Sequence, residues 1–95
     1  MSTKDDFVRK MHAKLGQWNA EIDALSARAD AVEASARAEY HKQLETLRGK
    51  RDHARSMLSE LESASEGAWL DLKAGVELAW ESVSEAVRSA AARFK

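Results

Sequence analysis

The chain has 95 residues, enough for one domain but close to the length at which a single hydrophobic core becomes thin. Charged residues make up 33% and aromatic residues 6%, and there is no proline, a composition typical of long helices or coiled coil. The 15 basic and 16 acidic side chains give a net charge of -1, so no overall field attracts nucleic acid or anionic lipid.

The N-terminal segment MSTKDDFVRK carries acids and no apolar core, so it does not resemble a secretory signal. Charges interrupt every segment well before the roughly 20 apolar residues that a membrane-spanning helix needs. The absence of cysteine excludes disulfides, thiolate metal sites and cysteine nucleophiles. We therefore expect a cytoplasmic protein in which residues 1–95 form a single helical domain.

Apolar or small residues recur in alternating steps of three and four, the a/d seam of a heptad repeat. The first run comprises Val8, Met11, Leu15, Trp18, Ile22, Leu25, Ala29, Val32 and Ala36. After an extra step of four to Tyr40, the run continues with Leu44, Leu47, Arg51, Ala54, Leu58 and Leu61. Such a stutter relaxes a supercoil locally without ending a helix.

The segment AVEASARAEY, residues 31–40, lies where the chain could reverse. It contains no Gly, Asn, Asp or Pro, the residues that a tight turn usually recruits, and most of its residues favour helix. The pattern keeps its phase across Gly49, which we assign to a helix interior despite a cost of about 1 kcal/mol. The sequence therefore predicts one helix over about 4–63.

A boundary is indicated at LESASEGAWL, residues 61–70. Ser63 and Glu66 have capping-box spacing, Ser65 is a second possible cap, and Gly67 loosens the chain. A new stripe follows, made of Trp69, Leu72, Val76, Ala79 or Trp80, Val83, Val87, Ala90 and Phe94. These features predict a second helix over about 67–94.

The two predicted helices differ in length by about a factor of two. A helix over 4–63 would be a rod of roughly 90 Å, and a second helix folded back on it covers only one half. An antiparallel dimer covers the other half, giving two coiled-coil-like three-helix bundles joined by continuous helices. The alternative all-α arrangement is a monomeric three-helix bundle with a turn within 31–40.

The three tryptophans, Trp18, Trp69 and Trp80, lie on the apolar stripes and are expected to pack in the core. The alternative is insertion of the amphipathic segment 67–95 into a membrane surface. Membrane-surface helices are usually rich in Lys and Arg, whereas this segment balances four bases with four acids. Core packing is the preferred interpretation.

Polar residues that could carry chemistry do not form a recognisable site. His12, His41 and His53 have no histidine partner at a spacing of three or four, and no Glu-x-x-His motif occurs. The basic run RGKRDHAR, residues 48–55, distributes its charges around a helix, which argues against a nucleic-acid interface. We predict no catalytic, cofactor-binding or metal-binding residues, no cofactor and no enzymatic activity.

Three segments, WNAEIDALSARAD, AEYHKQLETLRGKRD and AWLDLKAGVELAWESVSEAV, resemble a family of short bacterial coiled-coil stress-response proteins that is named after a cyanobacterial member. The most specific part is the Ala-Trp block of residues 68–80, whereas Gly49 and His53 depart from the family pattern. The resemblance implies a cytoplasmic helical protein linked to stress, with no catalytic residues.

The function predicted from the sequence is a non-enzymatic helical scaffold or protein-interaction protein that is related to stress. Its expected partner is a second copy of the chain in an antiparallel dimer, with no nucleic acid. The alternative function is a peripheral membrane-surface or lipid-binding protein that acts through residues 67–95.

Overall fold

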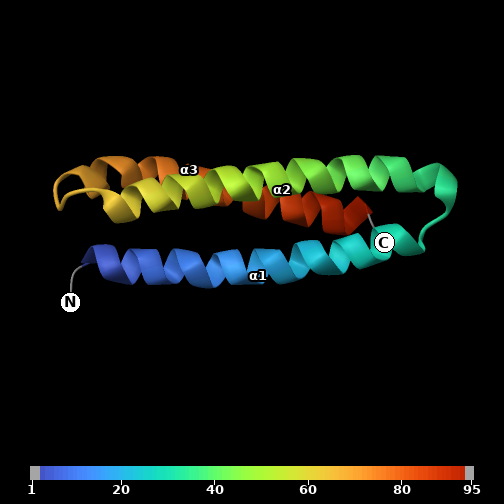
Figure 1. Ribbon diagram of the computed structural model, residues 1–95, viewed down its shortest axis with the longest axis horizontal. Helices are drawn as coiled ribbons and strands as arrows, with labels where there is room; N and C mark the ends of the chain where they lie inside the picture. Colours follow the sequence, from blue (N-terminus) through green and yellow to red (C-terminus); the bar gives the residue numbers. More distant parts are fainter. Residues whose placement is uncertain (1–2, 94–95) are drawn as a thin grey trace.

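The computed structural model describes residues 3–93, and these form three helices (Figure 1). The helices are α1 (Thr3–Ala31), α2 (Ala34–Ser63) and α3 (Ala68–Arg93). The all-α prediction is confirmed, and the bounds of α3 lie within one residue of the predicted helix. Phe94, assigned to the last turn of that stripe, lies outside the described residues.

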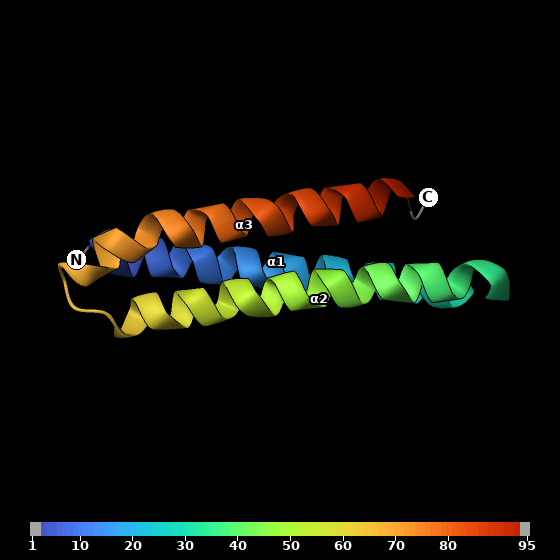
Figure 2. The same ribbon diagram turned by 90° about the horizontal axis from the view of Figure 1, so that it is seen from above.

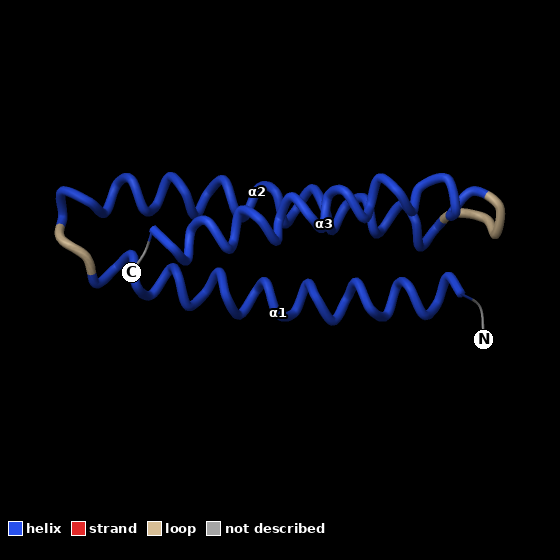
Figure 3. Tube along the Cα trace, turned by 180° about the vertical axis from the view of Figure 1, so that it is seen from behind, coloured by secondary structure: helices blue, strands red, loops and turns tan. Residues whose placement is uncertain are grey.

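The helices lie side by side in an up-down-up bundle. The helix α2 runs antiparallel to both α1 and α3, which lie parallel to each other (Figures 1 and 2). Two short connections at opposite ends of the bundle join the helices (Figure 3). The described part of the chain measures 51 × 18 × 18 Å, so it is not a rod of roughly 90 Å. The single chain adopts the monomeric three-helix alternative.

The core is one apolar seam along the bundle axis, and it matches the predicted stripes. Its buried members are Met11, Leu15, Trp18, Ile22, Leu25, Ala29, Leu44, Leu47, Ala54, Leu58, Leu61, Trp69, Val76, Trp80, Val83, Val87 and Ala90. Arg51 is the polar member of the α2 stripe. It lies half-buried at the seam and donates a hydrogen bond from Nη1 to Asn19 Oδ1 across the α1/α2 interface, at 3.1 Å.

The prediction of one helix over 4–63 is wrong. The helix ends at Ala31, and α2 begins at Ala34 after the two residues Val32 and Glu33. This reversal lets each stripe bury against the other two within one chain, so the half from Val8 to Val32 does not require a partner. Ile22, for example, is fully buried against its own chain.

The reversal needs no special turn residue because its backbone is unexceptional. Glu33 has φ -60° and ψ 150°, an extended conformation open to any L-residue, and no non-glycine residue from 3 to 93 has a positive φ. The carbonyl of Glu33 accepts hydrogen bonds from the N–H groups of Ala36 and Arg37, at 3.0 and 3.1 Å. The absence of Gly and Asn therefore did not exclude a break here.

The second connection lies where the sequence predicts it. Of the two caps considered, Ser65 performs the role, since its Oγ accepts a hydrogen bond from the Ala68 N–H at 3.4 Å. Ser63 instead is the last residue of α2. Gly49 lies inside α2, as predicted, so it does not break the helix.

Polar contacts fasten the start of α1 to the end of α2. The ammonium of Lys4 donates to the carbonyl oxygens of Glu62 and Ala64, at 2.9 and 2.7 Å. About two turns further along α1, His12 Nε2 forms an ion pair with the Glu62 carboxylate. A cation at the C-terminus of α2 satisfies carbonyls that lack intrahelical partners and complements the helix dipole.

Candidate functional site

The three tryptophans are core residues, as predicted. Trp18, Trp69 and Trp80 are 5%, 3% and 3% exposed, so none presents its indole to a membrane surface in this fold. No helix within residues 3–93 offers an apolar stretch that is long enough to cross a membrane. The large apolar side chains that α3 does expose are Leu70 and Leu78, at 59% and 67%.

The histidines remain apart from one another. His12 forms an ion pair with Glu62. His41 Nε2 lies 3.5 Å from Asp30 Oδ1 across the α1–α2 connection. His53 is exposed on α2. No group of three or more metal-ligating side chains occurs among residues 3–93.

The basic run 48–55 is partly used for interhelical contacts. Arg48 Nη2 donates to Ser26 Oγ at 3.4 Å, and Arg51 bonds Asn19 on α1 and its neighbour Asp52. Two of its cations are thus engaged along the α1/α2 seam rather than gathered on a free surface. That the run does not bind nucleic acid stays a prediction.

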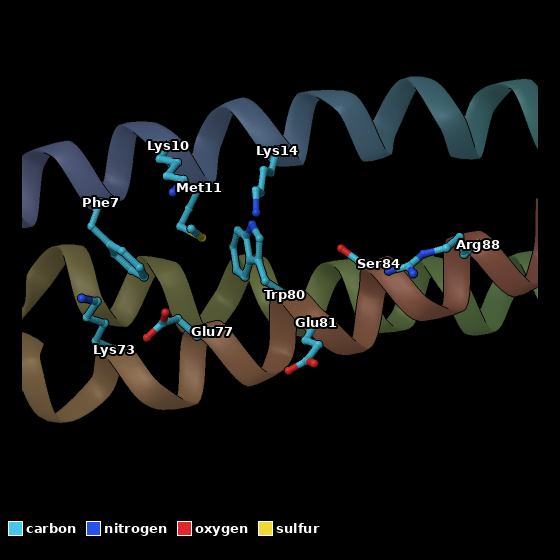
Figure 4. A pocket seen from close by; sticks show the side chains of 10 residues that line it. All are labelled: Phe7, Lys10, Met11, Lys14, Lys73, Glu77, Trp80, Glu81, Ser84 and Arg88. Carbon is cyan, nitrogen blue, oxygen red and sulfur yellow. The ribbon is translucent and has the colours of Figure 1, made fainter.

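A groove of about 420 Å³ runs between α1 and α3. Phe7, Met11 and Trp80 form its apolar floor, whereas most of the remaining lining is charged (Figure 4). Small-molecule sites in proteins usually enclose about 300–1,000 Å³ and combine an apolar lining with a few convergent polar groups. The volume of this groove falls within that range.

Trp80 supplies an unsatisfied donor to this groove. Its indole Nε1 is buried and has no hydrogen-bond acceptor among residues 3–93. A buried donor without a partner costs about 1–3 kcal/mol, and tryptophan normally finds an acceptor for this group. The ring packs against Trp18, with centroids 5.2 Å apart and planes at 50°, so the indole cannot turn freely toward solvent.

A second donor faces the same point. Lys14 on α1 extends its ammonium toward the indole nitrogen of Trp80 (Figure 4). Neither group can accept a hydrogen bond, so the two donors cannot satisfy each other. Lys10 lies one turn earlier on the same wall, and like charges at a spacing of four repel.

The wall formed by α3 carries both signs of charge. Lys73 lies over the Phe7 ring, with Nζ 5.5 Å from its centroid, and Arg88 lines the far end of the groove. The acids on this wall are Glu77 and Glu81, and Glu81 directs its carboxylate away from α1 (Figure 4). Four cations against two carboxylates give the lining a positive balance in a chain whose net charge is -1.

Sequence reasoning missed this groove because the position of Trp80 on the α3 stripe predicts core packing but does not show whether its N–H finds an acceptor. The signal available was the pair Lys10 and Lys14, which flank the α1 stripe on one side at a spacing of four. That pair indicates a basic edge along the seam. Which helix forms the opposite wall depends on the fold.

Comparison of the chain with protein-family models, curated proteins and solved structures finds no match. The resemblance to the stress-response family therefore stays a prediction.

Proposed function

We propose that this chain is a non-enzymatic helical scaffold that self-associates by exchanging α1 between two copies. In the exchanged dimer, α1 of each chain packs on α2 and α3 of its partner, with the same side-chain contacts as in the closed bundle. Domain exchange is a low-cost route to a dimer because it requires no new interface. The observation that carries the proposal is the two-residue connection between α1 and α2.

Several properties of this connection favour opening. The N-cap residue Glu33 makes no side-chain capping bond to α2. The flanking residues Ala31 and Ala34 are the strongest helix formers, so straightening would join α1 to α2 in a sequence that favours helix.

The closed connection is held by surface contacts. Arg37 Nη2 donates to the Val32 carbonyl at 3.2 Å, and His41 lies 3.5 Å from Asp30. These groups are largely exposed, and exposed polar contacts contribute little net stability. They oppose opening without preventing it.

The free energy required is modest. A short tether gives α1 an effective concentration in the mM range for docking on its own chain. A dimer dissociation constant of about 10 µM is about 100-fold lower than this effective concentration. Straightening of the two hinges together must therefore supply a factor of about 100, which is about 1.4 kcal/mol for each hinge. Straightening pairs backbone groups that the break leaves unbonded at two helix ends, and each bond contributes about 0.5–1.5 kcal/mol net.

An exchanged dimer would have a use as a scaffold because it displays two copies of the outward face of α3. That face carries Leu70 and Leu78 beside Glu85 and Glu81, whose carboxylate points away from α1, so it suits an amphipathic helix with basic flanks. Two copies on one assembly would bind a two-site partner with increased avidity.

The test compares two substitutions at one position. Glu33→Ser adds a capping side chain and should favour the break, whereas Glu33→Ala adds a helix former and should favour the straight form. With about 1 kcal/mol per hinge between them, their dimer dissociation constants should differ by roughly 30-fold in sedimentation velocity. Equal constants, or monomers at every concentration, would contradict exchange.

A role in stress and a cytoplasmic location are predictions from the sequence. The first depends on the resemblance in residues 68–80, and raised abundance of the protein in stressed cells would support it.

A further inference from the structure

We propose that the groove between α1 and α3 binds an amphipathic carboxylate, such as a medium-chain fatty acid. The flexible Lys14 side chain would move aside, so that the carboxylate lies between its ammonium and the indole N–H of Trp80. Its hydrocarbon chain would cover the apolar floor formed by Phe7 and Met11. This site goes beyond the scaffold function and does not depend on it.

The head-group position follows from the two donors. Trp80 Nε1 is buried without an acceptor among the described residues, and Lys14 extends toward it from the opposite helix (Figure 4). A carboxylate has two oxygens that accept hydrogen bonds, so one group can satisfy both donors. Charge-assisted hydrogen bonds of this kind are shorter and stronger than neutral ones.

The charges around the groove select an anion over a cation. Lys10 adds a second ammonium beside Lys14, and no ion pair joins either lysine to Glu77 or Glu81 within residues 3–93. A bound anion would also relieve the repulsion between the two lysines.

The half-buried Phe7 ring offers an apolar tail a surface to cover, which a small inorganic ion would leave unused. Phe7 contacts Trp69 at a centroid distance of 6.2 Å and lies half-buried at the mouth of the groove, while Met11 is 5% exposed. Aromatic and thioether side chains adapt to alkyl chains, and methionine in particular fits irregular apolar shapes. The volume of about 420 Å³ is sufficient for a small amphiphile and much too small for a folded partner.

The experiment titrates decanoate, below its micelle concentration, into the full chain. The readout is the indole N–H resonance of Trp80 in ¹H–¹⁵N spectra, identified by its loss in Trp80→Phe. We expect a saturable downfield shift of this resonance, as a new hydrogen bond forms. Lys14→Met should weaken the affinity about tenfold, the scale of one charge-assisted bond.

Matched controls separate the sources of binding. Lys42→Met removes an exposed α2 lysine outside the groove and should leave the affinity unchanged. Decanol, which lacks the charge, should bind at least about tenfold more weakly. An equal response to decanol would reduce the site to apolar partition, and an equal response to phosphate would reduce it to an anion site.

Either of those results would overturn the proposal, as would the absence of a saturable shift. Lys14 is exposed, so the Lys14→Met protein should still fold and tests the site even if the Trp80→Phe protein does not fold. An unchanged decanoate affinity in Lys14→Met would be equally decisive against the proposed head-group position.

Discussion

Trp18 of α1 and Trp80 of α3 pack with ring centroids 5.2 Å apart and planes tilted by 50°, at the centre of the interface between two parallel helices. Tilted aromatic pairs at this separation contribute about 0.5–1.5 kcal/mol beyond the area they bury. The contact joins the first helix to the last, so residues far apart in the sequence share one core. It also fixes the direction of the Trp80 N–H.

Trp80→Ala should lower the free energy of unfolding by about 3–5 kcal/mol because it empties a buried aromatic position. Urea denaturation followed by circular dichroism measures the change. Leu78→Ala, two residues earlier and 67% exposed, is the matched control and should change stability by less than about 0.5 kcal/mol. Equal effects of the two substitutions would mean that Trp80 is not a core residue.

Two helical glycines can be filled without a clash. A Cβ added at Gly16 or Gly49 meets nothing within 4 Å, and both residues lie inside helices. Gly16→Ala and Gly49→Ala should each stabilise the protein by about 1 kcal/mol, because alanine restricts the unfolded chain and favours helix. This corresponds to a rise in melting temperature of about 4–8 °C for a domain of this size.

Gly75 provides the comparison for that prediction. A Cβ at this position lies 3.1 Å from Met57 Cε, so Met57 must move its flexible end. Gly75→Ala should therefore gain less than the other two substitutions. If Gly49→Ala lowered the melting temperature instead, Gly49 would not lie in a regular helix.

The contact between the start of α1 and the end of α2 can be tested separately. Lys4→Met removes the ammonium that bonds the carbonyls of Glu62 and Ala64, and should cost about 1 kcal/mol. Lys42→Met, at an exposed position on α2, controls for the loss of one positive charge. Thermal unfolding should separate the two variants by about 4–8 °C, and identical melting temperatures would contradict the cap.

Most of the fold could be predicted because heptad spacing reports burial directly. Positions such as Leu44, Leu58 and Val83 recur at steps of three and four, and each is almost completely buried. The break after Ser63 carries its own chemical signal, since Ser65 is a capping residue and Gly67 follows it.

The reversal at Val32 and Glu33 could not be read in the same way. Its dihedral angles are open to any residue, so the turn requires no particular residue type that the sequence could reveal. Whether the helix bends there depends on whether α1 finds its cover within the chain, which is a property of all three stripes together. The groove was missed for the same reason, because Lys14 and Trp80 are 66 residues apart and meet only through the fold.

The exchange of α1 is tested most directly by one intrachain distance. Spin labels are placed at Ala13 on α1 and Ser56 on α2 through cysteine substitutions, both exposed, in a chain that has no native cysteine. The closed bundle places them across adjacent helices, within roughly 30 Å. In a straightened chain they are separated by 43 residues of helix, or roughly 65 Å.

Labelled protein is diluted into excess unlabelled protein, so that only distances within one chain are measured. We predict the short distance alone in dilute solution and a growing long component as the total concentration rises, larger in Glu33→Ala than in Glu33→Ser. A short distance alone at every concentration, in Glu33→Ala as well, would contradict the exchange of α1.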